Sequence, residues 1–224
     1  MSTIIDIETT SKMDHIWCCG IQTDHEKRQR ILVNSMQLQE LTKSTQSIVG
    51  HNIISFDAPK IATLWGVTLE PSKLWDTLLL SRLWNPRLLG GHSLAAWGDR
   101  LGYPKLDFTD YDGGLTDDMK VYCKKDVEVT SKLLDHLTKQ LAADGFSEEC
   151  QRLEHDVALI VAQQESNGFK HDLERANQLL TDLMGRMNEL EREVQQVFPP
   201  LVEERISEKT GKRLKDKVTV FNLG

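Results

Sequence analysis

Two carboxylates separated by one residue, Asp6 and Glu8, lie in an apolar segment close to the N-terminus. Residues 4–10 are rich in β-branched side chains and contain no glycine or proline, which predicts a β-strand. Side chains alternate across a strand, so Asp6 and Glu8 should point to one face. Carboxylate oxygens held on a rigid strand suit divalent cations such as Mg²⁺. The alternative is a solvated strand face that bears two acids, because short motifs often have no function.

Two further aspartates occupy positions from which they could join such a metal site. Asp57 begins a predicted helix directly after a strand, and Asn52 falls in the turn between them. Taken alone, the two residues are typical of an N-cap and of a turn. Asp126 lies in a predicted helix over 117–143, on the face that it shares with Tyr122 four residues earlier. Either these two are a surface acid and a core aromatic, or a bound cation relieves the cost of an unpaired carboxylate on an apolar stripe.

The elements that must position these residues have an α/β pattern. We expect the strand over 4–10 to lie near the centre of a sheet, because three further short strands and several helices follow it. Asp76 should cap a helix, although an accessory role beside the metal is also open. The other strands are predicted at 16–22, 30–34 and 47–51, and the other helices at 36–44, 94–101, 147–167 and 172–198.

Composition excludes several classes of protein. The 224 residues are 39% hydrophobic and 27% charged, which is typical of a globular protein. No apolar run is long enough to cross a membrane, and we expect no secretory signal and a cytoplasmic location. The net charge of −7 leaves no general attraction to nucleic acid, so any such contact must be local or pass through metal ions. The four cysteines lack metal-site spacing and are expected to be free thiols.

In their order and spacing, these motifs resemble the 3′→5′ proofreading exonuclease domains of family A DNA polymerases. That family forms the tyrosine type of the Asp-Glu-Asp-Asp superfamily, and the closest likeness is to the replicative polymerases of T-seven-like bacteriophages. The resemblance implies a ribonuclease H-like fold, in which helices flank a central mixed sheet, followed by a helical, thumb-like segment. The matching motifs are Asp6-Ile7-Glu8-Thr9, Asn52-Ile53-Ile54-Ser55-Phe56-Asp57 and Tyr122-Cys123-Lys124-Lys125-Asp126, and the likeness extends to residues 75–83, 92–102 and 164–169.

The resemblance also implies an activity, namely two-metal hydrolysis of the 3′-terminal phosphodiester of single-stranded DNA, with release of nucleoside 5′-monophosphates. Two Mg²⁺ ions, or Mn²⁺, would be the cofactors. Asp6 would bridge the metals, Glu8 and Asp126 would hold the one beside the nucleophile, and Asp57 would support the other. Tyr122 would orient the attacking water. The residues expected to contact the terminal nucleotides are Thr9, Asn52 and Phe56.

The resemblance divides the chain into an exonuclease domain over 1–146 and, over 147–224, a helical linker with the beginning of a polymerase thumb. The helix over 172–198 carries an apolar stripe of the kind that pairs with another helix. Residues 203–220 are predicted to form a hairpin around Thr210-Gly211. Its basic tip is either a solubilising loop or an element that contacts DNA phosphates, through Lys209, Lys212, Arg213 and Lys215.

The sequence ends before any polymerase palm or fingers. We therefore expect a fragment or one half of a divided polymerase, whose partner is a separate palm-and-fingers chain or the remainder of the same polymerase. Two other functions stay open. One is a 3′→5′ exoribonuclease of the same superfamily, and the other is a non-catalytic scaffold for a polymerase partner.

Overall fold

The computed structural model describes residues 2–24, 28–199, 201–203 and 217–219, together with residues 207, 211, 213 and 215. The chain forms two compact units, Met1–Gly168 and Phe169–Gly224. Each unit is considered by itself below. The functional division after residue 146 that the sequence suggests stays a prediction.

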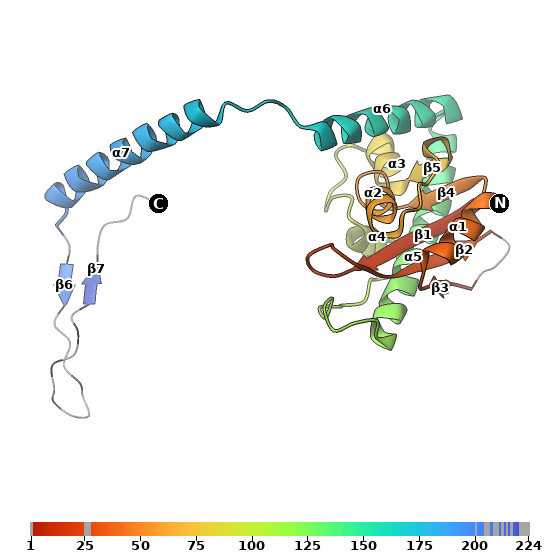
Figure 1. The fold of residues 1–224 in the computed structure, drawn as a ribbon, viewed down its shortest axis with the longest axis horizontal. Coiled ribbons are helices and arrows are strands. Elements are labelled where there is room, and N and C mark those ends of the chain that lie inside the picture. The colour runs from red at the N-terminus through yellow and green to blue at the C-terminus, as the bar shows by residue number, and fades with distance from the viewer. Residues whose placement is uncertain are drawn as a thin grey trace. The chain divides into compact units, whose positions relative to one another are not determined.

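The first unit is built on a five-stranded sheet in the order β3-β2-β1-β4-β5, with β1 at its centre as the sequence predicts (Figure 1). β1 runs antiparallel to β2 and parallel to β4, so the sheet is mixed. β1 is thus paired on both sides, with β4 over its first three residues and with β2 along its length. The strands are β1 (Ser2–Thr9), β2 (Ile16–Thr23), β3 (Arg30–Leu32), β4 (Ser47–Gly50) and β5 (Leu74–Asp76).

The two faces of β1 pack against different groups of helices. Ile5 and Ile7 join a core that contains Leu38 and Ile61, both nearly inaccessible to solvent. That face is covered by α1 (Ser35–Ser44), α2 (Asp57–Lys60), the π-helix η1 (Ile61–Trp65) and α6 (Glu148–Asn167). Ile4 points the other way and packs with Val127 of helix α5 (Asp117–Ala143). Because side chains alternate along a strand, Asp6 and Glu8 share the face of Ile4.

Three helices build the layer on the α5 side of the sheet. The layer consists of α3 (Thr77–Trp84), α4 (Leu94–Leu101) and α5 (Asp117–Ala143), and its core includes Trp97 and Leu133. The side chains of Ser93 and Thr116 accept hydrogen bonds from backbone N–H groups in the first turns of α4 and α5. Caps of this kind fix where each helix begins, and they give α5 a defined register against β1.

Three local features differ from the sequence-based expectations. β3 ends at Leu32, and Asn34 caps α1 instead of extending the strand, because its side chain accepts a bond from Gln37 N. The three-residue strand β5 was not predicted, since its pairing with β4 is parallel and leaves no alternating pattern. The 3₁₀ helix η2 (Pro71–Lys73) leads directly into it.

The second unit contains α7 (Leu173–Val197) and two short strands, β6 (Leu201–Glu203) and β7 (Lys217–Thr219), which pair antiparallel as the predicted hairpin requires. Apolar side chains of α7 are exposed, among them Leu179, Leu183 and Leu190. Helix pairing through this stripe therefore stays a prediction. Lys209 and Lys212 lie outside the described residues, whereas Arg213 and Lys215 are described and exposed.

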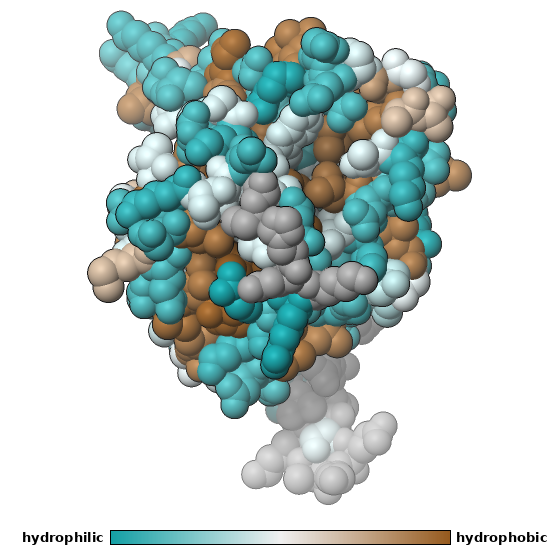
Figure 2. Space-filling view, turned by 90° about the vertical axis from the view of Figure 1, so that its right-hand side faces the viewer, coloured by the Kyte–Doolittle hydropathy of each residue, from teal (hydrophilic) through white to brown (hydrophobic). Residues whose placement is uncertain are grey.

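Polar side chains dominate the surface that Figure 2 views, with apolar ones in separate groups between them. Among the described residues, no helix is both long enough and apolar enough to span a membrane. The thiols of Cys18, Cys19 and Cys123 are buried and free, as the cysteine spacing predicted, and Cys150 is free and half-buried.

Candidate active site

The two acids of β1 lie on one face and reach the same point. A carboxylate oxygen of Asp6, one of Glu8 and the thiol of Cys123 all lie within 4.8 Å of one another. Glu8 is only 5% exposed, although it is a charged residue. The alternative interpretation of this pair, a solvated strand face, is therefore wrong. The two carboxylates instead form the floor of a cleft of about 320 Å³ between β1 and α5.

Helix α5 brings Tyr122 and Asp126 into the same cleft, one turn apart. Asp126 is 4% exposed, so the alternative of a surface acid is excluded. The helix approaches β2 closely at Gly20, where an added Cβ would lie 2.8 Å from Cys123 Sγ. Gly20 pairs with Asp6 across the β1–β2 ladder. The missing side chain at Gly20 thus allows α5 to lie close to the β1 carboxylates.

Asp57 is held to β1 and is not among the described residues that line the cleft. Its Oδ1 accepts a hydrogen bond from the backbone N–H of Ile7, between the two strand acids, at 3.1 Å. The expectation that Asp57 is an N-cap is wrong, because Asp57 is the first residue of α2 and Phe56 occupies the cap position without a side-chain bond. The hydrogen-bond partner of this carboxylate is therefore set by a tertiary contact and not by the local preference of aspartate for helix ends. Its burial, at 3% exposure, is consistent with that contact.

Of the three residues expected to contact nucleotides, two line the cleft and one does not. Thr9 and Phe56 line the cleft together with the carboxylates. Asn52 is not among the described residues that line it, and it occupies the predicted turn with a φ of 66°. Its backbone N–H donates to Asp76 Oδ1 at 2.8 Å.

Burial raises the pKa values of all four carboxyl groups, and repulsion from neighbouring acids adds to it at Asp6, Glu8 and Asp57. Loss of hydration is the largest cause at each of them, and the charge of Asp126 adds to it at Asp6 and Glu8. The pKa of Glu8 rises to about 8. That of Asp57 rises to about 7, despite the opposing hydrogen bond from Ile7. Acids placed so that their charges repel are typical of functional sites.

One oxygen of this cluster is left without a partner. Among the described residues, nothing hydrogen-bonds to Asp126 Oδ1, although the atom is buried. An unsatisfied buried acceptor is costly. The surrounding side chains offer carboxylate oxygens, which hard divalent cations prefer as ligands. The residues present therefore fit a bound metal ion.

Two residues near the cleft were not found from the sequence. Lys105 forms an ion pair with Asp126 Oδ2 at 2.6 Å. Tyr111 lines the cleft, and its ring lies edge-on to that of Tyr122. Both belong to the irregular segment between α4 and α5, which carries no motif. Only the path of the folded chain brings them to the cleft, so no local signal could have identified them.

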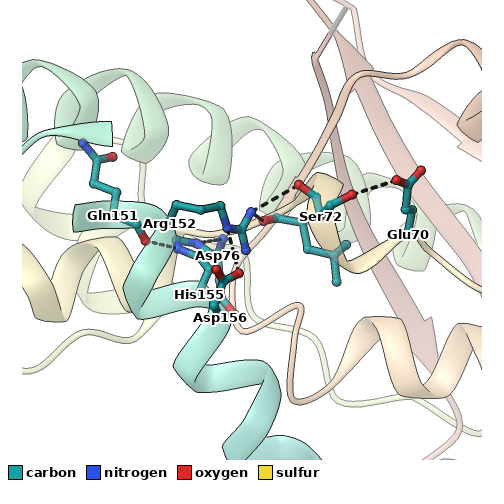
Figure 3. A network of polar contacts seen from close by, with 8 residues as sticks. Glu70, Ser72, Asp76, Gln151, Arg152, His155 and Asp156 are labelled. Carbon is teal, nitrogen blue, oxygen red and sulfur yellow. Dashed lines mark hydrogen bonds and ion pairs between the residues drawn. The ribbon is translucent and has the colours of Figure 1, made fainter. Parts of the chain in front are cut away.

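Asp76 supports the turn that precedes Asp57. As expected, its carboxylate caps α3 by accepting from Leu78 N at 2.9 Å. The same carboxylate accepts from the N–H groups of Asn52 and Ile54. In Figure 3, Asp76 in turn meets His155 of α6, whose Nε2 accepts from Asp76 N at 2.7 Å. The turn that leads to Phe56 and Asp57 is therefore fixed to both α3 and α6.

Comparison with known proteins assigns the chain to a protein family. The family model described as 3′-5′ exonuclease matches residues 3–142, which is more than half of the chain. The chain belongs to the 3′-5′ exonuclease family. All four carboxylates of this exonuclease lie inside the matched segment, and so does Tyr122. The resemblance noted from the motifs is thus confirmed.

Two curated relatives of the exonuclease are phage enzymes. The DNA-directed DNA polymerase of Escherichia phage T7 is 25% identical over 87% of this chain, and that of Enterobacteria phage T3 is 28% identical over 67% of it. The matches cover 37% and 29% of the two polymerases, so the chain spans about a third of the length of these relatives. It contains an exonuclease domain homologous to theirs.

Solved structures confirm the ribonuclease H-like fold. Brucella melitensis NrnC with bound Mg²⁺ superposes with a TM-score of 0.59 at 19% identity, covering 77% of this chain and 89% of NrnC. Escherichia coli RNase D, an exoribonuclease, superposes with a TM-score of 0.54 at 17% identity, covering 70% of this chain and 45% of RNase D. At these identities the likeness concerns the fold alone.

Proposed function

We propose that this exonuclease removes nucleotides from the 3′ end of single-stranded DNA, with Mg²⁺ or Mn²⁺ as its cofactor. The observation that carries the proposal is the convergence of Asp6, Glu8 and Asp126 on one cleft, with Asp57 bonded to the same strand and with Asp126 Oδ1 unsatisfied among the described residues. The polymerase relatives support DNA rather than RNA as the substrate.

The chain's own carboxylates would hold two metal ions. Asp6, Glu8 and Asp126 present oxygens to the cleft, and Asp57 would support the second ion from beneath β1. When bound, such ions lower the pKa of a coordinated water and stabilise the charge that develops on the phosphate and on the leaving 3′ oxygen. This chemistry requires no catalytic histidine.

Tyr122 would orient the attacking water instead of removing its proton. Burial raises the pKa of the Tyr122 hydroxyl above its ordinary value, and the charge of Asp126 raises it further. A phenol of that kind is a poor base and a good hydrogen-bond donor. Thr9 and Phe56, which line the cleft, would contact the terminal nucleotide. Asn52 would help to position that nucleotide through its side-chain amide, from the turn in which it lies.

The polymerase context is part of the proposal. Because the phage relatives are polymerases of about three times the matched length, we infer that this exonuclease acts beside polymerase palm and fingers, in the same protein or in a partner chain. The segment 147–224 would join the two activities as linker and thumb. Within it, the exposed Arg213 and Lys215 would contact DNA phosphates. A palm-and-fingers chain that fails to bind this protein in a pull-down would contradict the partner-chain form of this proposal.

The activity is tested on a 5′-labelled single-stranded DNA oligonucleotide with Mg²⁺, beside RNA of the same sequence. We expect a ladder that shortens from the 3′ end, stops with EDTA and is absent from the Asp6→Ala, Glu8→Ala double variant. A matched control replaces two surface acids, Glu40 and Glu70, by alanine and should leave the ladder unchanged. Faster cleavage of the RNA would favour an exoribonuclease. No cleavage by folded wild-type protein, alone or with a polymerase partner, would favour a scaffold.

A further inference from the structure

Lys105 carries a positive charge into the centre of the carboxylate cluster. Its ammonium lies 2.6 Å from Asp126 Oδ2, with side-chain exposures of 21% for the lysine and 5% for the aspartate. The same ammonium lies 5.0 Å from the centre of the Tyr122 ring. It also acts electrostatically on Asp6 and Glu8. A single cation thus pairs with one of the four proposed metal ligands and lowers the pKa of two others.

The backbone around Lys105 is fixed, so this position is built into the fold. Tyr103 N donates to Gly98 O at 2.8 Å, where the chain leaves α4. A Cβ at Gly98 would lie 2.7 Å from Tyr103 O and 3.4 Å from Lys105 N, so only glycine permits this close approach. Further along the same segment, Asp112 is bonded to Ser11 through both the backbone N–H and the hydroxyl group. The segment is therefore anchored at both ends, with Lys105 aimed inward.

We propose that Lys105 is an internal counter-ion that occupies, in the metal-free protein, the place at Asp126 that a divalent cation takes. This inference rests on the proposed function, because it assumes that the cleft binds a metal ion. One Asp126 oxygen is bound by the ammonium and the other is free. A metal ion that binds Asp126 must compete with the ammonium, which moves away as the ion enters.

Two consequences follow for the protein. Without metal, Lys105 offsets part of the repulsion among the acids and so stabilises the fold. With metal, the lysine is released toward the mouth of the cleft, where its charge is available to the phosphate of a bound nucleotide. Lys105 therefore weakens metal binding and stabilises the metal-free protein.

The test is calorimetric titration of Mn²⁺ into the wild type, Lys105→Met and Lys125→Met. Lys125 is a matched control, because it has a similar exposure of 22% and pairs at 2.9 Å with Glu128, outside the cluster. We expect Lys105→Met to bind Mn²⁺ about tenfold more tightly, since a partly buried opposite charge no longer competes. Lys125→Met should bind as the wild type does. In EDTA, Lys105→Met should melt below the wild type, and saturating Mn²⁺ should close that gap.

A second measurement uses the wild type alone and does not depend on the folding of a variant. Amine acetylation of Lys105, followed by mass spectrometry, should be slow in EDTA and several-fold faster with Mn²⁺, while Lys125 is unchanged. The proposal would be overturned if folded Lys105→Met bound Mn²⁺ no more tightly than the wild type. It would also be overturned if the acetylation rate of Lys105 were the same with and without Mn²⁺. Failure of the proposed function has a different result, since the wild type itself would then bind no Mn²⁺.

Discussion

The imidazole of His155 accepts a hydrogen bond from the backbone N–H of Asp76 at 2.7 Å, across a buried contact between α6 and β5. Its other nitrogen, Nδ1, donates to Gln151 O one turn earlier, so the ring is held in one neutral tautomer. Burial agrees with this state, because it lowers the pKa of His155. Asp76 fixes the turn at Asn52 and Ile54. Helix α6 thus supports the turn that leads to Asp57.

Replacing His155 by leucine tests this support. Leucine fills much of the same space but leaves the buried N–H of Asp76 without an acceptor, which costs about 1–3 kcal/mol. We expect the free energy of unfolding in urea to fall by that amount. The exposed His171 is a matched control, and His171→Leu should change it by less than about 0.5 kcal/mol. Equal stability of the two variants would show that the bond contributes little.

Gly20 is expected to tolerate no side chain. A methyl group there would lie 2.8 Å from Cys123 Sγ and 2.9 Å from Val127 Cγ2, so Gly20→Ala should push α5 away from β1. We expect a loss of about 1–3 kcal/mol in unfolding free energy, together with a large loss of nuclease rate.

The control for Gly20 is Gly185→Ala in α7, where an added Cβ meets nothing within 4 Å. Alanine is the better helix former, so this change should be neutral or stabilising by up to about 1 kcal/mol. Full activity in Gly20→Ala would contradict the role given to this close approach.

Asn52 combines a backbone role with a proposed substrate role, and two variants separate them. Its φ of 66° is strained for most residues, so Asn52→Ala should cost about 1 kcal/mol of stability. Asn52→Gly relieves the strain and removes only the side-chain amide. If that amide contacts the nucleotide, Asn52→Gly should keep its melting temperature and show a raised KM for DNA. An unchanged KM would limit Asn52 to the turn.

The buried His51 is expected to reduce the stability of the folded protein in acid. Burial is the main cause that lowers the pKa of His51 to about 4, helped by the charges of Lys105 and Arg82. An unfolded histidine titrates near pH 6.5, so between pH 6.5 and 4 the unfolded form of His51 binds more protons than the folded form, and the contribution of His51 to stability falls as pH falls. At pH 5 the loss from this residue is about 2 kcal/mol.

The measurement for His51 is urea unfolding at pH 7.5 and pH 5.0. His51→Asn keeps a polar atom that can bond Thr77 Oγ1, which lies 2.9 Å from His51 Nδ1. The difference in stability between the two pH values should be smaller for the variant than for the wild type. The same pH dependence in both would mean that His51 is protonated in the folded protein.

Local rules were enough to find the carboxylates but not everything around them. Strand alternation joined Asp6 to Glu8, and the helical repeat joined Tyr122 to Asp126, because both rules connect spacing in the sequence with one face of an element. Some helix ends also follow a local rule, since Thr116 and Ser147 cap their helices with their own side chains.

The remaining features depend on contacts between distant segments. Asp57 looked like a cap from its neighbours, yet it bonds to Ile7, fifty residues earlier in the chain. Lys105 reaches Asp126 only because the chain packs closely on Gly98. No pattern within ten or twenty residues contains that information, so only the fold shows these two relationships.

The contact between His155 and Asp76 also bears on how small a working enzyme can be. A polypeptide that stops at residue 146 retains Asp6, Glu8, Asp57 and Asp126, and a motif search would count it as complete. It lacks α6, however, and with it the acceptor for a buried N–H next to the turn. We therefore expect the smallest autonomously folding nuclease to extend through α6, beyond the last described residue that lines the cleft.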